Sequence, residues 1–113
     1  MQEGRTTGTN TPAPVDAGPA DLAPGACVWR EVRGVPLILA RDSHGGLHAL
    51  AGTCSHALMS LEGARIRGHA LVCPHHGARF ELATGRPLGP PASAPIERFA
   101  VTEENGRLQV RLP

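Results

Sequence analysis

Two short segments of the chain combine cysteine with histidine and have the composition of metal-binding loops. Cys54-Ser55-His56 is followed, after sixteen intervening residues, by Cys73-Pro74-His75-His76. Each segment supplies one thiol and one imidazole, in the pattern C-x-H…C-x-x-H. Thiolate and imidazole together suit zinc or iron. The pattern indicates a metal centre, and an iron–sulfur centre with mixed ligands would make the protein an electron carrier.

Two kinds of centre are compatible with these four donors. One is a tetrahedral zinc site with two Cys and two His ligands. The other is a two-iron, two-sulfide cluster with Cys54 and Cys73 on one iron and His56 and His76 on the other. Zinc modules commonly group like ligands, as C-x-x-C with H-x-x-x-H. Here each segment mixes the two ligand types, which favours the two-iron cluster.

The composition restricts the class of protein. At 113 residues the chain is expected to form one domain, and its 14 Gly and 11 Pro favour short strands and turns over long helices. A net charge of +1 gives no electrostatic case for binding nucleic acid or a membrane surface. Three Cys are too few, and odd in number, for a disulfide framework. No secretory signal or membrane-span-length apolar run is present, so a cytoplasmic protein is expected.

The chain divides into an expected tail and an expected domain. Residues 1–24 are rich in Gly, Pro, Thr and Ala and lack aromatic residues, so they are predicted to be a flexible tail. Residues 25–113 are predicted to form an antiparallel all-β domain with both Cys–His pairs on loops. The expected strands cover residues 28–32, 35–39, 47–50, 71–72 and 79–82, and a final hairpin pairs residues 96–101 with residues 108–112. Asn105-Gly106 is the strongest hairpin signal.

The motif residues resemble the cluster-binding motif of Rieske proteins. The resemblance includes Cys54-Ser55-His56, the sixteen-residue gap and Cys73-Pro74-His75-His76-Gly77. It continues through residues 78–85 and Gly89-Pro90-Pro91, and it covers roughly residues 22–113. It implies an antiparallel β-sandwich base carrying a small cluster-binding subdomain made of two loops, within about residues 52–92.

The resemblance also implies the ligands and the cofactor. Cys54, His56, Cys73 and His76 would hold one [2Fe-2S] cluster per chain, and Gly89-Pro90-Pro91 would form a loop that covers it. His75 is not a ligand in the family pattern and is expected to be a solvent-facing residue at the rim.

Residues near the motif predict a low reduction potential. Rieske proteins of respiratory and photosynthetic complexes have a disulfide between the two loops, where this chain has Met59 and His75. They also place a Ser and a Tyr as hydroxyl donors to sulfur, where this chain has Ala78 and Phe80. Hydrogen bonds to sulfur stabilise the reduced, more negative state, so their loss should lower the potential. The expected value is about −150 mV, at the low end of the Rieske range.

The sequence therefore predicts a one-electron carrier, monomeric when free, that passes electrons from a reductase to a terminal oxygenase or a similar redox enzyme. Only 37 residues follow His76, too few for a separate catalytic iron domain, so the chain is not expected to be an enzyme by itself. The first alternative is the small subunit of a nitrite-reductase-like enzyme. The second is a zinc-stabilised structural or interaction module.

Overall fold

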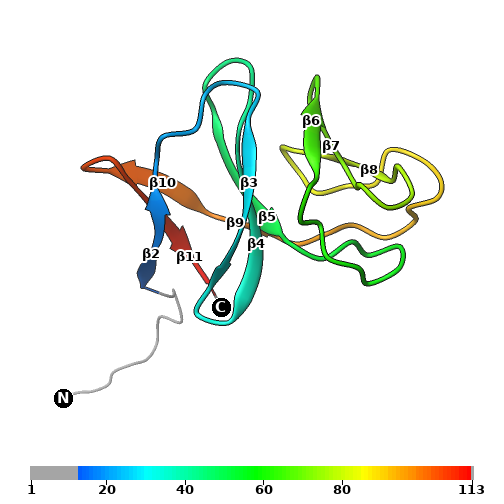
Figure 1. Ribbon diagram of the computed structural model, residues 1–113, viewed down its shortest axis with the longest axis horizontal. Helices are drawn as coiled ribbons and strands as arrows, with labels where there is room; N and C mark the ends of the chain where they lie inside the picture. The colour runs from blue at the N-terminus through cyan, green and yellow to red at the C-terminus, as the bar shows by residue number, and fades with distance from the viewer. Residues whose placement is uncertain (1–12, 113) are drawn as a thin grey trace.

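The computed structural model describes residues 13–112, which form three antiparallel sheets (Figure 1). The strands of this part of the chain are β2 (Pro14–Pro19), β3 (Cys27–Val32), β4 (Val35–Arg41), β5 (Leu47–Ala51), β6 (Arg65–Arg67), β7 (Ala70–Val72), β8 (Arg79–Glu81), β9 (Arg98–Phe99), β10 (Val101–Glu104) and β11 (Arg107–Arg111). The strand orders are β10-β11-β2, β3-β4-β5-β9 and β6-β7-β8. The predicted all-β antiparallel class is therefore confirmed. No helix of the described residues is long and apolar enough to cross a membrane.

The central strand β4 is buried on both faces and separates two apolar cores. Leu37 and Leu39 point to one side and are fully buried, while Ile38 and Ala40 point to the other side with 1% exposure each. Because side chains alternate along a strand, an uninterrupted apolar run such as this one is suited to a strand covered on both faces. Residues of β2 and β11 pack on the face of Leu37 and Leu39, and residues of β7 and β8 pack on the face of Ile38 and Ala40.

The first core joins the two sheets of the base. We call it the base core, and its fully or nearly fully buried members are Ala17, Leu37, Leu39, Ala49, Leu108 and Val110. Its members come from β2, β4, β5 and β11, so it packs the β10-β11-β2 sheet against the β3-β4-β5-β9 sheet (Figure 1). The expected β-sandwich base is therefore present.

The second core lies between the base and the small sheet β6-β7-β8. We call it the shared core, and its members include Ile38, Leu50, Cys54, Leu61, Leu71, Cys73 and Phe80. On the small sheet, Ile66, Leu71 and Phe80 form a cross-strand row that faces this core. Burial of one such side chain contributes about 1.5–3 kcal/mol, so the shared core fixes the small sheet to the base.

Two hairpins of the base close with two-residue turns of the same kind. Asn105-Gly106 joins β10 to β11 with positive φ at both residues, and Glu104 pairs with Arg107 across it. This is the type I′ geometry that an Asn-Gly pair favours, so the predicted turn is confirmed. The predicted pairing of residues 96–101 with residues 108–112 is wrong for residues 96–99, because Arg98 and Phe99 form β9 and pair with β5. Arg33-Gly34 joins β3 to β4 in the same way, with φ of 52° and 79°.

The predicted flexible tail of residues 1–24 is wrong for residues 14–24. Pro14–Pro19 forms β2, which pairs with β11 through Val15 and Val110, and Ala17 is only 3% exposed in the base core. The composition of residues 14–19 did not indicate a strand, because an edge strand tolerates Pro and needs few apolar side chains. The domain therefore begins before residue 25. Residues 1–12 lie outside the described part of the chain.

The turn between β4 and β5 is organised by one carboxylate. Asp42 Oδ1 accepts hydrogen bonds from the backbone amides of His44 and Gly46, at 2.9 and 2.8 Å. Asp42 Oδ2 lies 2.8 Å from Nε2 of His48, whose side chain is only 12% exposed. The His48 hydrogen bond, followed by the amide bonds, lowers the pKa of Asp42 from 3.8 to about 2. The ionised carboxylate therefore stabilises the folded state.

We expect Asp42→Asn to lower the midpoint of thermal unfolding at pH 7. A carboxyl group whose pKa falls on folding stabilises the protein above its unfolded pKa and loses that effect as the pH falls through the folded pKa. The difference between wild type and Asp42→Asn should therefore shrink between pH 3.8 and about 2. Circular dichroism melts at a series of pH values measure this difference.

Asp21→Asn is the matched control, because Asp21 is exposed and forms no hydrogen bond with any described residue. Equal melting midpoints for Asp21→Asn and Asp42→Asn at pH 7 would contradict this account of the turn.

Candidate metal centre

The two predicted Cys–His segments lie on loops at the same end of the molecule. The first loop (residues 52–64) connects β5 to β6, and the second loop (residues 73–78) connects β7 to β8. A third segment, the proline loop (residues 87–96), follows β8 and contains a cis peptide bond between Pro90 and Pro91. All three are at the side of the molecule occupied by the small sheet (Figure 1).

The two loops form the same turn around their cysteines. In the first loop, the Cys54 amide donates to the Met59 carbonyl and the Leu58 amide donates to the Cys54 carbonyl, each at 2.8 Å. The second loop repeats both bonds around Cys73 with the residues four and five positions later, at 3.2 and 2.7 Å. The turns thus match in register, although the histidine follows the cysteine by two positions in one loop and by three in the other.

The matched turns differ at the residue four positions after the cysteine. The second loop has Gly77 there, with φ of 70°, and the first loop has Leu58, with φ of 55°. Glycine adopts this left-handed conformation without penalty, whereas a leucine loses about 1–2 kcal/mol. Leu58 is also 79% exposed, so packing in the described chain does not offset this cost.

The two thiols are buried next to each other. Cys54 and Cys73 are 1% and 2% exposed, and both belong to the shared core. Burial raises the pKa of Cys54, and a hydrogen bond with Cys73 raises that pKa further. A metal that binds here must displace the thiol protons, because the thiolate is the ligand form.

The two imidazoles lie at the surface. His56 and His76 are exposed, and their rings meet edge to face with centroids 5.2 Å apart and an interplanar angle of 87°. The structure thus brings all four predicted donors to one end of the molecule, as a buried thiol pair and an exposed imidazole pair.

The arrangement in two pairs tests which metal group these residues fit. Within residues 13–112, no three His, Cys, Asp or Glu side chains converge on a single point. A Rieske cluster takes two Cys on one iron and two His on the other, so it requires two pairs of donors. The buried thiol pair and the exposed imidazole pair fit that group.

Both ends of the first loop are attached to strand β3, through residues whose roles the sequence did not indicate. Nε1 of Trp29 donates to the Gly52 carbonyl at 3.1 Å, and the Cys27 thiol donates to the Ala64 carbonyl at 3.2 Å. Gly52 has no room for a side chain, since a Cβ would lie 2.7 Å from the Leu37 amide nitrogen. Burial raises the pKa of the Cys27 thiol, consistent with a structural role. The sequence offered one signal of these roles, which is that Trp29 is the only Trp of the chain.

The structure describes the positions where the resemblance implies a disulfide and two hydroxyl groups in some Rieske proteins. All cysteines of the described chain are free, so no bridge joins the two loops. Ala78 and Phe80 are fully buried and bring no hydroxyl group. His75 is exposed, as expected, but its Nε2 also lies 2.9 Å from the Ser60 carbonyl of the first loop.

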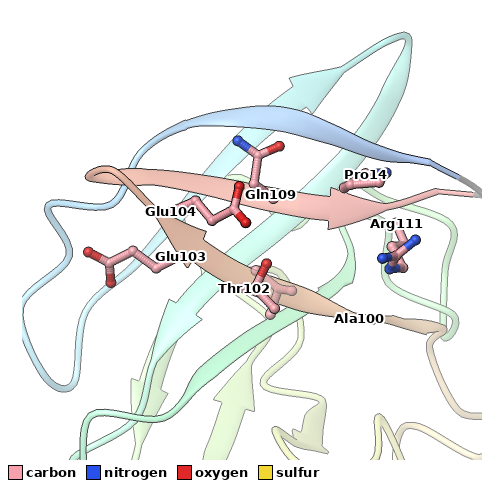
Figure 2. Close-up of a pocket in the computed structure, with 8 residues that line it drawn as sticks. Pro14, Ala100, Thr102, Glu103, Glu104, Gln109 and Arg111 are labelled. Carbon is pink, nitrogen blue, oxygen red and sulfur yellow. The ribbon is translucent and has the colours of Figure 1, made fainter.

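A hollow elsewhere on the surface has no metal-binding character. Figure 2 shows it on the β10-β11-β2 sheet, where Thr102, Glu103 and Glu104 of β10 lie near Gln109 of β11. No Cys or His lines it, and none of its lining residues belongs to the loops described above.

Comparison with known proteins supports an iron–sulfur assignment. The sequence profile of the Rieske [2Fe-2S] domain matches residues 13–100. The 3-phenylpropionate/cinnamic acid dioxygenase ferredoxin subunit of Shigella flexneri serotype 5b is 34% identical over 79 residues, covering 69% of this chain and 74% of that protein. Ferredoxin CarAc of Metapseudomonas resinovorans is 33% identical over 63 residues, covering 56% of this chain and 59% of the relative.

Solved structures of ferredoxins also resemble this chain. The ferredoxin of carbazole 1,9a-dioxygenase from Nocardioides aromaticivorans IC177 has a TM-score of 0.77 at 28% identity, covering 87% of this chain and 96% of that one. A complex of reduced oxygenase and oxidized ferredoxin in carbazole 1,9a-dioxygenase contains a chain with a TM-score of 0.74 at 29% identity, covering 85% of this chain and 99% of that one.

A protein assigned as the small subunit of an NADH-dependent nitrite reductase from Mycobacterium tuberculosis has a TM-score of 0.77 at 19% identity, covering 92% of this chain and 98% of that one. At that identity the likeness concerns the fold alone. The profile match is more specific, and it agrees with the paired thiols and imidazoles at the end of the molecule: this chain belongs to the Rieske [2Fe-2S] domain family.

Proposed function

We propose that the protein is a one-electron carrier, the ferredoxin component of an oxygenase system. The observation that carries this proposal is the separation of the donors into a buried thiol pair and an exposed imidazole pair. In this proposal Cys54 and Cys73 bind one iron of a [2Fe-2S] cluster, and His56 and His76 bind the other. When bound, such a cluster takes up and releases one electron at a time.

In this proposal the buried thiols and the exposed imidazoles have different roles. The shared core keeps water from Cys54 and Cys73, and a dry, apolar surrounding preserves metal–thiolate bonds. His56 and His76 are exposed and offer the point of closest approach for a redox partner. The proposed partners are a reductase that donates the electron and a terminal oxygenase that accepts it, as in the complex of oxygenase and ferredoxin in carbazole 1,9a-dioxygenase.

We also propose that the free protein is a monomer in the cytoplasm. Reducing conditions there keep cysteines as thiols, the form in which Cys54 and Cys73 are free to bind metal. Gel filtration of the purified protein tests whether it is monomeric.

We propose that the partner docks over Leu58 and the two histidines. Leu58 and Met59 are the exposed large hydrophobic side chains of the described chain, at 79% and 39% exposure, and both follow His56 closely. Leu58 also holds a strained backbone conformation that Gly77 avoids in the matched turn. Strain retained at an exposed apolar residue is typical of a site selected for binding.

The first test of the proposed function concerns the cysteines. We expect Cys73→Ser to remove the visible absorption of the purified protein and its EPR signal after dithionite reduction. Cys27→Ser is the matched control and should retain both, because the Cys27 thiol donates to the Ala64 carbonyl and is not one of the four proposed ligands. A Cys73→Ser protein with the wild-type spectrum would contradict the ligand assignment. A colourless wild type with one zinc per chain would favour the zinc-stabilised module.

The second test concerns the reduction potential. We expect a midpoint potential of about −150 mV, because no hydroxyl group reaches the cluster from Ala78 or Phe80. Ala78→Ser should raise the potential, since a hydrogen bond to sulfur stabilises the reduced state. Ala83→Ser, at an exposed position just beyond β8, is the control and should leave it unchanged. A clearly positive potential in the wild type would overturn this prediction.

The third test concerns docking. We expect Leu58→Gly to slow electron transfer from the reduced protein to an oxygenase component of the carbazole 1,9a-dioxygenase type. Loss of an apolar interface anchor should raise the half-saturating concentration about fivefold or more in stopped-flow measurements. The melting midpoint should stay the same or rise, because glycine relieves the left-handed strain.

Arg33→Gly is the matched control for docking. Arg33 has φ of 52° and lies in the turn between β3 and β4, outside the three loops. It should show the same release of strain with no effect on transfer. Equal transfer rates for Leu58→Gly and Arg33→Gly would rule out docking over Leu58.

A further inference from the structure

Three side chains connect the loops around the candidate centre by donating hydrogen bonds to backbone carbonyls. The bonds run from His75 Nε2 to Ser60 at 2.9 Å, from Ser55 Oγ to Ala94 at 2.6 Å and from Arg79 Nη2 to Leu88 at 3.0 Å. The first joins the second loop to the first loop, and the second joins the first loop to the proline loop. The third holds the proline loop to β8. Each of the three loops is therefore attached to a neighbour without a covalent bond.

We propose that His75 is a positioning residue that sets the distance between the two ligand loops through the Ser60 carbonyl. Ser60 lies in the first loop, directly after Met59, and His75 lies in the second loop. The hydrogen bond therefore joins the two ligand loops directly. As far as the cluster is concerned, this inference rests on the proposed function.

The location of Ser60 makes the bond effective. Thr53 and Ser60 form an isolated antiparallel bridge that closes the turn containing Cys54 and His56. Ser60 is followed by Leu61, which is fully buried in the shared core. Attachment at the Ser60 carbonyl therefore acts on the closed base of the turn and not on its tip.

The location of His75 completes the connection. His75 directly precedes His76, the imidazole donor of the second loop. A hydrogen bond from His75 to the base of the first loop therefore fixes His76 relative to His56. The ring centroids of His56 and His76 are 5.2 Å apart. The spacing of the two exposed imidazoles then depends on His75 as well as on the two separate turns.

The chemistry of the bond fixes the position of one proton. A carbonyl oxygen only accepts hydrogen bonds, so Nε2 of His75 must carry a hydrogen atom. Both the neutral Nε2–H tautomer and the imidazolium meet this requirement. The attachment is therefore present in either charge state of His75, as a positioning role requires. It also commits Nε2 to the Ser60 carbonyl, which agrees with His75 not being a metal ligand.

Three variants of the full-length protein test the proposal. His75→Leu removes the donor, and His75→Gln keeps an N–H group at a similar distance from the backbone. His69→Leu is the matched control, since His69 is an exposed histidine of the β6–β7 turn whose ring binds no described residue. The measurements are amide hydrogen exchange of residues 52–63 by mass spectrometry, the rate at which visible absorption is lost in excess chelator, and the EPR line shape after dithionite reduction.

We expect His75→Leu to speed both exchange in the first loop and loss of absorption about 3- to 10-fold, as removal of one hydrogen bond predicts. Its EPR line shape should also change, because the two imidazoles are no longer held at one spacing. His75→Gln should recover most of each effect, and His69→Leu should match the wild type. If His75→Leu behaves like His69→Leu, or if His75→Gln behaves like His75→Leu, the proposal is overturned.

The exchange measurement separates this proposal from the proposed function. It does not depend on which metal is bound, because it reports the backbone of residues 52–63 directly. A wild type that is colourless and contains zinc would end the electron-carrier proposal, while the contrast between His75→Leu and His69→Leu in exchange would still decide the role of His75.

Discussion

The burial of Cys54 and Cys73 in the shared core is the constraint on which the rest of the structure depends. These thiols pack with side chains of both the base and the small sheet. The loops that carry them must therefore begin inside the core and turn outward within a few residues. The matched turns achieve this, because each cysteine uses its own amide and carbonyl to close the loop that exposes the following histidine. A buried pair and an exposed pair of donors are the direct result.

The two turns share one geometry but carry different surface chemistry. Gly77 satisfies the left-handed position of the second loop without strain, and Leu58 places an apolar side chain at the same position of the first loop. The first loop is also the one held most extensively, by Trp29 and Cys27 at its ends, by Ser55 toward the proline loop and by His75 from the second loop. A loop that presents a strained, exposed residue next to a metal ligand needs such support.

Much of this could be predicted from the sequence, because the strongest signals are local. The donors, the apolar run of residues 35–39 and the Asn105-Gly106 turn each depend on neighbouring residues, and the structure contains the corresponding elements. Strand β2 could not be predicted, because its partner β11 is about ninety residues away and its own composition resembles that of a tail. The bonds of His75 and Ser55 were also missed, since each accepting carbonyl belongs to a distant residue and leaves no trace in the sequence.

The central claim is that one metal group is held by two thiolates and two imidazoles. Pulsed EPR of the dithionite-reduced, 15N-histidine-labelled protein tests it most directly, since couplings to nitrogen report imidazoles bound to the metal. The account predicts two strongly coupled histidine nitrogens in the wild type, with one lost or altered in His56→Asn and in His76→Asn. A reduced protein whose spectrum shows no strong coupling to histidine nitrogen would contradict it.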